Sequence, residues 1–521
     1  MRRIALAFAG WGVVAAAAAP AMAQDTDDSR NAIFATTRQL VVSNVKDPFP
    51  VQGCTTSPAC LIKHPGPGGI SLREAIMAVN NATGPYTITF NAALAGKTIV
   101  LQNRFPPLTH SGVTLTGLKT KTGAPDITID ASHVLNQFSF PILFIAAPNF
   151  TMTGMNFTSP PSKAVSIMQI GGFNYGLTGH LVSSPAQMCC VVISGNAFRN
   201  GINNFAINVP AMNGNETISK LTFSNNTFSQ LGVGIELAAG DPAGRNNNTI
   251  EDVVVFGNTF FQSAPPDEPA VELAPCCGRN NLIQRVQIVQ NTFLDNGQCV
   301  ILDHQRQAVQ SSIQNVTIAR NVFIGNGNAL GPSGGNDQGT MNNEIRNVQF
   351  IDNLVALTAQ NSDAAQIDDN QGGAQNNKVS GLSFVNNTIY NGTKNFGGEA
   401  WGVWVISSGG VSGVSISNTI FWGNAGKPPI SGIASPSQVT YSIIDQTGFT
   451  GVNHNINADP RFVNPSGGNF QLQSGSPALN AGTHSGAPTV DLDCRPFHNP
   501  PSIGAYQFQG PSICSTTPPP P

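Results

Sequence analysis

The sequence predicts an all-β chain in which parallel sheets are stacked into one long coil. A short apolar run, an Asn and a further apolar residue two places on recur eight times between residues 196 and 418. Successive copies lie 30–34 residues apart, a period typical of stacked repeat architectures. Charged residues make up only 10% of the chain, against about 25% in ordinary globular proteins. The recurring Asn are Asn196, Asn226, Asn258, Asn291, Asn321, Asn353, Asn387 and Asn418.

The first 23 residues have the features of a secretory signal peptide. Arg2 and Arg3 precede an apolar stretch at residues 4–19, and a small-residue cleavage pattern follows at residues 21–23. We expect cleavage before Gln24 and an exported protein, periplasmic or extracellular. No later apolar stretch is long enough to cross a bilayer, and a net charge of -3 without a basic patch argues against nucleic acid. The expected product is an exported monomer without a membrane span or a nucleic-acid partner.

Residues 24–110 form a predicted N-terminal cap. Ser71 precedes an apolar-periodic run and Glu74 follows it three places later, which is the pattern of a helix with a capping box. Four segments with period-two alternation come next, which predicts strands. The strands are expected at residues 86–90, 97–101, 112–117 and 126–130.

Residues 111–450 hold the repeats. Each repeat has a strand before the Asn, a short strand after it, and a third apolar segment about 10–15 residues downstream. Three strands per turn, stacked in register, form parallel sheets around one elongated core. The third segments occupy residues 206–210, 234–238, 270–274, 299–303, 365–369 and 402–406, with only a weak candidate at 337–342 in the remaining repeat. Their predicted inward residues are Ile207, Ile235, Val271, Ile301, Ile367 and Trp404.

The recurring Asn are interpreted as structural residues. A tight bend between two strands needs a residue that tolerates left-handed backbone, and Asn is among the few non-Gly residues that do. One Asn per coil also lets each side-chain amide bond the amides above and below it. The sequence therefore predicts an Asn ladder that holds the coils together.

The nine Cys follow the predicted signal peptide, and an oxidising compartment would permit disulfides among them. Cys54 with Cys60, and Cys494 with Cys514, are plausible pairs. The remaining cysteines have no connectivity that the sequence settles, and the odd total leaves one unpaired. They are the adjacent pairs Cys189-Cys190 and Cys276-Cys277, and Cys299.

The repeat and two terminal segments resemble a known family. The repeat with its ladder resembles the right-handed parallel β-helix of the pectin-lyase-like superfamily. ISLREAIMAVNNA at residues 70–82, and ADPRFVNPSGGNFQLQSGSPALNAGT at 458–483 with the following DLDCRP and IGAYQF, resemble the choice-of-anchor Q group of secreted bacterial proteins. This resemblance implies a helical cap, a C-terminal segment at residues 451–510 and a Pro-rich tail at 511–521. Some relatives carry a cell-surface anchor; this chain has no apolar tail, so anchored and free forms both stay open.

Acidic residues recur on the third segments. The position after each predicted inward residue is expected to face outward, and neighbouring strands lie about 4.8 Å apart. Carboxylates on adjacent coils would therefore either raise one pKa or hold a cation. The outward positions are Asn208, Glu236, Glu272, Leu302, Asp368 and Val405, followed by Asp303, Asp369 and then His304.

Three interpretations of these acids stay open. In a glycoside hydrolase, Glu236 and Glu272 would be the acid and the base or nucleophile. In a lyase acting on uronate polymers, Ca²⁺ would neutralise the sugar carboxylate and a basic side chain would take the proton. In the third interpretation the acids are a solvated stripe on an exposed sheet face. For the lyase, the metal ligands would be Glu272, Asp303 and Asp368, and the base His304 or Arg306.

The β-helix fold alone does not decide among these interpretations, because it hosts lyases, hydrolases, isomerases and structural proteins. The ordered polygalacturonase motifs are missing from the chain. The leading hypothesis is a secreted protein that binds, and as a polysaccharide lyase or glycoside hydrolase cleaves, an acidic uronate polysaccharide or cell-surface glycan. The alternative is a non-catalytic extracellular scaffold or adhesin. A groove walled by residues 239–250, 328–345 and 370–380 would favour the enzyme, and Phe261, Tyr390, Trp401, Trp404 and Trp422 are candidates for stacking on sugars.

Overall fold

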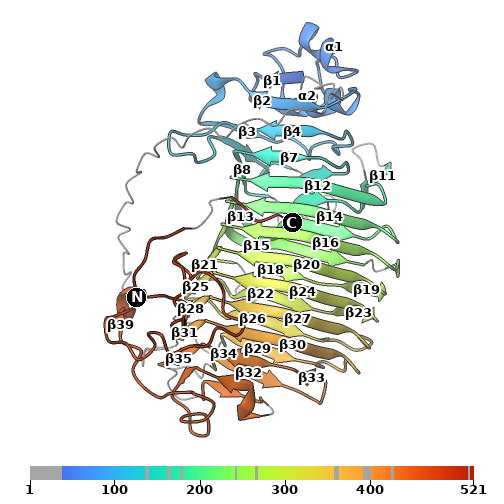
Figure 1. The fold of residues 1–521 in the computed structure, drawn as a ribbon. Coiled ribbons are helices and arrows are strands. Elements are labelled where there is room, and N and C mark those ends of the chain that lie inside the picture. The colour runs from blue at the N-terminus through green and yellow to red at the C-terminus, as the bar shows by residue number, and fades with distance from the viewer. Residues whose placement is uncertain are drawn as a thin grey trace, which may run out of the picture. The chain divides into compact units, whose positions relative to one another are not determined.

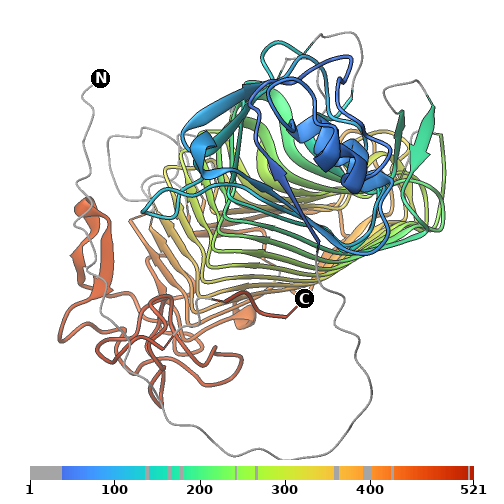
Figure 2. The same ribbon diagram turned by 90° about the horizontal axis from the view of Figure 1, so that it is seen from above.

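Each repeat folds into one turn of a coil, and equivalent strands of successive turns pair in parallel (Figure 1). Seen from above, the turns lie over one another (Figure 2). The structure is a computed structural model that describes residues 38–520, apart from 135–139, 161–165, 176–179, 241–242, 264–267, 357–362, 391–400, 424–427, 434 and 514–516. The predicted signal peptide and Cys514 lie outside the described residues. The prediction of an all-β parallel coil is confirmed.

Three sheets run along the coil. The first sheet contains the strands that precede the recurring Asn, the second contains the short strands after it, and the third contains the downstream strands. The first sheet consists of β1 (Arg38–Val42), β2 (Tyr86–Phe90), β4 (Val113–Thr116), β7 (Thr151–Thr153), β12 (Gln187–Ser194), β14 (Thr217–Ser224), β16 (Thr249–Phe256), β20 (Leu282–Val289), β24 (Ser312–Ala319), β27 (Glu344–Ile351), β30 (Lys378–Val385), β34 (Ser415–Ser417) and β37 (Val439–Thr440), with β33 (Val411–Ser412) also paired to β30.

The second and third sheets share two long strands that bend from one sheet into the other, β13 (Ala197–Ala211) and β15 (Thr227–Ala239). The second sheet also contains β3 (Lys97–Val100), β5 (Ile127–Asp130), β8 (Met155–Thr158), β17 (Thr259–Phe261), β21 (Thr292–Leu294), β25 (Val322–Ile324), β28 (Leu354–Ala356), β31 (Thr388–Tyr390), β35 (Ile420–Trp422) and β38 (Ile443–Ile444). The third also contains β6 (Leu143–Ile145), β9 (Ser166–Ile170), β18 (Pro269–Leu273), β22 (Gln298–Asp303), β26 (Asn328–Ser333), β29 (Ala365–Asp368), β32 (Val403–Ile406) and β36 (Ile430–Ser431). The weak candidate for a third strand at residues 337–342 is therefore wrong, because β26 is the third-sheet strand of that repeat.

Buried apolar side chains fill the inside of the coil, one layer per turn. Alternate residues of each strand point inward, as the period of two predicts. Phe side chains of the second sheet stack on one another, with ring centroids 4.7–5.7 Å apart along the series. The series is Phe157, Phe198, Phe228, Phe260, Phe293 and Phe323.

The predicted Asn ladder is present from Asn196 to Asn387. In each rung up to that point, the backbone N–H and the side-chain amide of one Asn donate to the Oδ1 of the next. The eighth predicted member, Asn418, is wrong: Thr419 takes the ladder position and accepts from the backbone N–H of Asn387. The left-handed residue is also not the ladder Asn but the residue before it, such as Gln290 with φ 58°.

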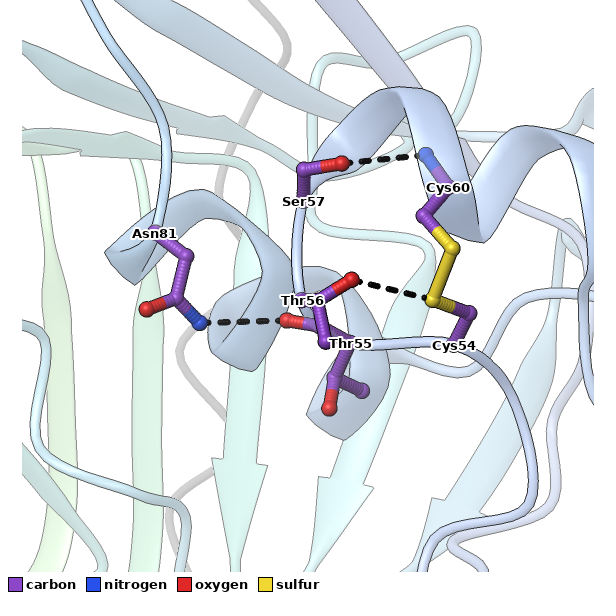
Figure 3. The surroundings of a disulfide bond; sticks show 6 residues. All are labelled: Cys54, Thr55, Thr56, Ser57, Cys60 and Asn81. Atoms are coloured by element: carbon purple, nitrogen blue, oxygen red, sulfur yellow. Dashed lines mark hydrogen bonds between the residues drawn. A yellow bond between two sulfur atoms is a disulfide. The ribbon is translucent and has the colours of Figure 1, made fainter.

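The N-terminal cap covers one end of the coil with α1 (Pro58–Lys63) and α2 (Leu72–Asn80). The predicted capping box of Ser71 and Glu74 is confirmed. Arg73 of α2 is fully buried and binds Asp47 at 2.7 Å. The disulfide between Cys54 and Cys60 joins the start of α1 to the preceding loop (Figure 3).

The C-terminal segment packs against the outer face of the second sheet. Its antiparallel strands β39 (Phe462–Asn464) and β40 (Asn469–Leu472) contribute to a second apolar cluster that includes Leu354, Ile420 and Ile443 of the coil. Cys494 is in a disulfide. Within the described part of the chain, no helix is both long and apolar enough to cross a membrane.

Candidate active site

The outward side chains of the third sheet form straight columns parallel to the coil axis, because its strands pair in register. Ile207, Ile235 and Val271 point inward as predicted, and the next inward residue is Val300. The predicted inward residue Ile301 is therefore outward, since β22 has two adjacent apolar residues and the first of them enters the core. Trp404 is also outward, because its neighbours Val403 and Val405 are the residues of β32 that enter the core. Leu302 and Val405, which were expected to face outward, are therefore buried inside.

One outward column, which we call the axial column, passes through the predicted acids. Paired residues of neighbouring strands define its members. They are Gln169, Asn208, Glu236, Glu272, Ile301, Gly331, Gln366 and Trp404.

Glu236 and Glu272 are adjacent members of the axial column, on β15 and β18. Their backbones are therefore about 5 Å apart. Burial, together with the charge of Glu272, raises the pKa of Glu236 to about 8. Burial also raises the pKa of Glu272 to about 7, although the Nε2 of Gln305 donates to its Oε1 at 2.7 Å and lowers it. The two carboxyls thus hold at least one proton near neutral pH, which is the state an acid–base pair needs.

Arg306 supplies a positive charge beside this pair. It lies in β23 (Gln305–Val309), which directly follows β22 and pairs with β19 (Cys276–Arg279) in a separate two-stranded sheet. Its backbone N–H donates to Asp337 at 2.7 Å, whereas its exposed guanidinium makes no hydrogen bond or ion pair with any residue that the structure describes. The charge of Arg306 lowers the pKa of both Glu236 and Glu272, so it is close enough to act on a ligand at the pair.

Asp303 and Asp368 lie in a second outward column, separated by Ser333. Both are buried, at 4% and 5% exposure, and loop side chains cover them. Asn336 donates to Asp303, and Ser333 and Gln371 donate to Asp368 at 2.8 Å. Burial raises the pKa of Asp303 to about 8, with the charge of Glu272 adding to it, and burial raises that of Asp368 to about 6. The sequence predicted one stripe of acids, whereas the structure places them in two columns.

Two further residues singled out from the sequence have positions inside the protein. His304 is fully buried, and among the residues that the structure describes neither ring nitrogen has a partner in hydrogen-bonding geometry. Burial lowers its pKa to about 3, so the ring is neutral and does not reach a ligand on the surface. Burial opposes the ionisation of Asp369, but hydrogen bonds from Ser408 and Gly410 outweigh it and lower the pKa of that carboxyl.

The three expected calcium ligands, Glu272, Asp303 and Asp368, do not converge on one point. Glu272 is in the axial column, and Asp303 and Asp368 are two strands apart in the other column. In the described part of the chain, no three Asp, Glu, His or Cys side chains are grouped so that they could hold a metal ion. This donor set therefore does not fit a protein-held Ca²⁺, and we derive no chemical step through one.

The aromatic candidates separate into two groups. Trp404 of the axial column is half-buried and stacks on Trp401, with ring centroids 4.3 Å apart. Tyr390 and Trp422 instead pack into the apolar cluster beneath the C-terminal segment. Phe261 is exposed on the second sheet. Of these aromatic residues, Trp404 is the one that lies in the axial column with Glu236 and Glu272.

The sequence did not reveal the neutral residues that orient the acids. Gln305, Asn336 and Gln371 each donate to one of the carboxyls. They lie in loops or at strand ends, where no periodic pattern singles out an amide. Each lies either about one repeat or a few residues away from the carboxyl that it contacts. This spacing could identify them only if the strand register were already known.

The chain was compared with known protein families, curated proteins and solved structures. No protein-family model and no curated protein matches the chain. Among solved structures it is similar to an alginate lyase from Paenibacillus sp. str. FPU-7, with 13% identity over 66% of this chain and 96% of that one and a TM-score of 0.35. It is also similar to a pectate lyase, with 12% identity over 91% of this chain and 97% of that one and a TM-score of 0.33. A third similar structure is the catalytic domain of a GH87 α-1,3-glucanase, with 11% identity over 81% of this chain and 70% of that one and a TM-score of 0.31.

The strand pairing of the chain itself defines a parallel β-helix protein. Similarity at this level of identity and TM-score carries no argument about activity. The functional proposal has to rest on the side chains of the axial column.

Proposed function

We propose that this protein binds and cleaves an acidic polysaccharide along the axial column, with Glu236 and Glu272 as the reacting pair. The observation that carries the proposal is the pairing of these two carboxyls on adjacent strands, both with a raised pKa, beside the guanidinium of Arg306, which has no partner among the residues that the structure describes. Two side chains whose backbones lie about 5 Å apart can bring their carboxyl groups to about 5 Å, the separation found in glycosidases that retain the anomeric configuration. Hydrolysis is therefore the chemistry that the pair supports best.

The roles within the pair follow from the environments of the two residues. Glu236, with the higher pKa, would donate a proton to the oxygen of the leaving sugar. Glu272, oriented by Gln305, would be the nucleophile or base. Arg306 would bind the carboxylate of a uronate unit, since a guanidinium matches a carboxylate in shape and charge.

A lyase mechanism is the second candidate, and the observation that favours it is the exposed guanidinium of Arg306, which the described part of the chain leaves without a partner. There the base would take a proton next to the uronate carboxylate, and no water would be consumed. Because His304 is buried and neutral, we leave it out of this role.

The axial column gives the polymer a direction. Trp404 lies four strands beyond Glu272, or about 19 Å along the coil axis. A sugar chain lying parallel to the axis would therefore meet the acid pair and the stacked tryptophans together. Export to the periplasm or the exterior, membership of the choice-of-anchor Q group and an acidic glycan as partner belong to the same proposal, and the disulfides are consistent with export.

The test is incubation with a panel of uronate and neutral polysaccharides, each with Ca²⁺ and with a chelator. New reducing ends without unsaturated products identify a hydrolase, and ultraviolet absorbance from unsaturated ends identifies a lyase. Glu236→Gln and Glu272→Gln are expected to lower the rate by about 10²–10⁴, whereas Glu251→Gln, on the first sheet, leaves it unchanged. No product from any polymer would favour the scaffold, and activity that survives both Gln variants would place the site elsewhere.

A further inference from the structure

Cys276 and Cys277 are adjacent in sequence and begin β19, at the edge of the candidate site. Their Sγ atoms are 2.6 Å apart. Two separate thiols do not approach so closely, whereas the sulfurs of a disulfide lie about 2.05 Å apart. The structure leaves the two cysteines unbonded to each other, yet the separation of their sulfurs is closer to a bond length than to a contact between two thiols.

The chain contains a second adjacent pair with the same backbone. Cys189 and Cys190 are joined by a disulfide. The second cysteine of each pair has left-handed backbone, with φ 65° at Cys190 and 52° at Cys277. Non-Cys residues on the neighbouring turns share this backbone, with φ 54° at Lys220 beside Cys190 and 48° at Arg306 beside Cys277. The left-handed backbone therefore belongs to the coil, and what the two pairs have in common is the close approach of their sulfurs.

We infer that Cys276 and Cys277 form a disulfide between neighbouring residues in the mature protein. The ring closes by thiol–disulfide exchange with a protein or small-molecule disulfide, such as the one carried by a thiol–disulfide oxidoreductase. One thiolate attacks that disulfide and releases its first sulfur as a thiol; the second cysteine then attacks the mixed disulfide and releases the other. The two protons pass to the donor, which is reduced by two electrons, while the Sγ–Sγ bond forms.

This ring has a structural consequence at the acid pair. Cys276 pairs with Gln305 of β23, and Gln305 is the residue that donates to Glu272. Gly240 packs so tightly on the same corner that an added Cβ would lie 1.6 Å from the carbonyl oxygen of Cys276. The disulfide would fix this corner, and with it the position of Gln305 relative to Glu272. It also removes two thiols from beside the carboxyls, whatever reaction these carry out.

Peptide mapping of the exported, full-length mature protein tests the inference. The protein is denatured without reductant, treated with N-ethylmaleimide and cleaved with trypsin. Residues 246–279 contain only these two cysteines, and residues 286–306 contain only Cys299, a buried cysteine without a disulfide in the described part of the chain. We expect the first peptide to be unlabelled and lighter than the dithiol form by two hydrogen atoms, and the second to carry one label. Two labels on residues 246–279, or a cross-link from them to another peptide, would overturn the inference.

Hydrogen exchange tests the structural consequence in the folded protein. In the double variant Cys276→Ser, Cys277→Ser, the amides of β19 and β23 should exchange about tenfold faster or more, because a local opening that the ring prevents becomes accessible. The matched control is Cys189→Ser, Cys190→Ser, which should leave β19 and β23 unchanged. Equal exchange in the two double variants would show that the ring does not fix this corner.

Discussion

The Asn ladder predicts a large loss of stability when one rung is removed from its middle. In Asn291→Ala, the Nδ2 bonds to the carbonyl oxygens of Val255 and Val289 and to Asn321 are lost, at original distances of 2.9–3.2 Å. The backbone N–H of Asn258 also loses the acceptor that it contacts at 2.9 Å. An unsatisfied buried N–H costs about 1–3 kcal/mol, and each lost bond about 1 kcal/mol. We therefore expect a destabilisation of about 4 kcal/mol or more.

Urea unfolding of the mature protein, followed by circular dichroism, measures this loss. Gln349→Ala is the matched control, since Gln349 is exposed on β27 and accepts only a weak bond from Thr317 at 3.4 Å; its effect should be within about 0.5 kcal/mol. Asn291→Asp keeps the acceptor for Asn258 but directs an oxygen at Asn321 and Val255, so it should be tolerated better at acid pH, where the carboxyl can donate. If Asn291→Ala costs no more than about 1 kcal/mol beyond the control, the ladder is not what holds the coils in register.

Three more perturbations follow from buried charges and the axial column. Because burial raises the pKa of Asp303 to about 8, the folded state keeps a proton that the unfolded chain loses near pH 4. The free energy of unfolding should therefore fall between about pH 4 and pH 8, by up to about 1.4 kcal/mol per pH unit. Asp303→Asn should remove this part of the slope, as measured by unfolding titrations at several pH values. Arg73→Met leaves Asp47 charged and buried and should cost about 3–5 kcal/mol, read from thermal melts, whereas a normal melting temperature would mean that the cap tolerates an unpaired carboxylate. Trp404→Ala should weaken binding of long uronate oligomers by about tenfold and leave short ones unaffected in fluorescence titrations; an equal loss for both lengths would remove Trp404 from the binding surface.

The ladder and the three sheets were predictable from sequence because each depends on a residue type that repeats with the coil. The error at Asn418 arose because Asn and Thr are adjacent there and either can accept the bond from Asn387. A second buried ladder was not predicted, although it uses the same hydrogen bonds between side chains of successive turns at another corner of the coil. Its members are Asn248, Asn281, Ser311, Asn343 and Asn377.

The candidate site was less predictable because its columns depend on the register to within one residue. Val300 and Ile301 are both apolar, and only the stacking on Val271 decides which enters the core. A shift of one residue exchanges the two faces of a strand, so the sequence placed Asp303 with Glu236 and Glu272. β26 was missed because Gly331 and Pro332 interrupt the alternation that marks a strand.

The stacked Phe side chains of the second sheet also make the coil a modular element of variable length. Within this series each ring stacks on the ring of the turn before and the ring of the turn after, so the duplication of one whole repeat would meet the same ring surfaces at both of its new junctions. An inserted repeat between Glu272 and Trp404 would move them apart by about 4.8 Å without altering the acid pair. Gene duplication, in evolution or in the laboratory, could thus set the length of polymer that this protein accommodates independently of its chemistry.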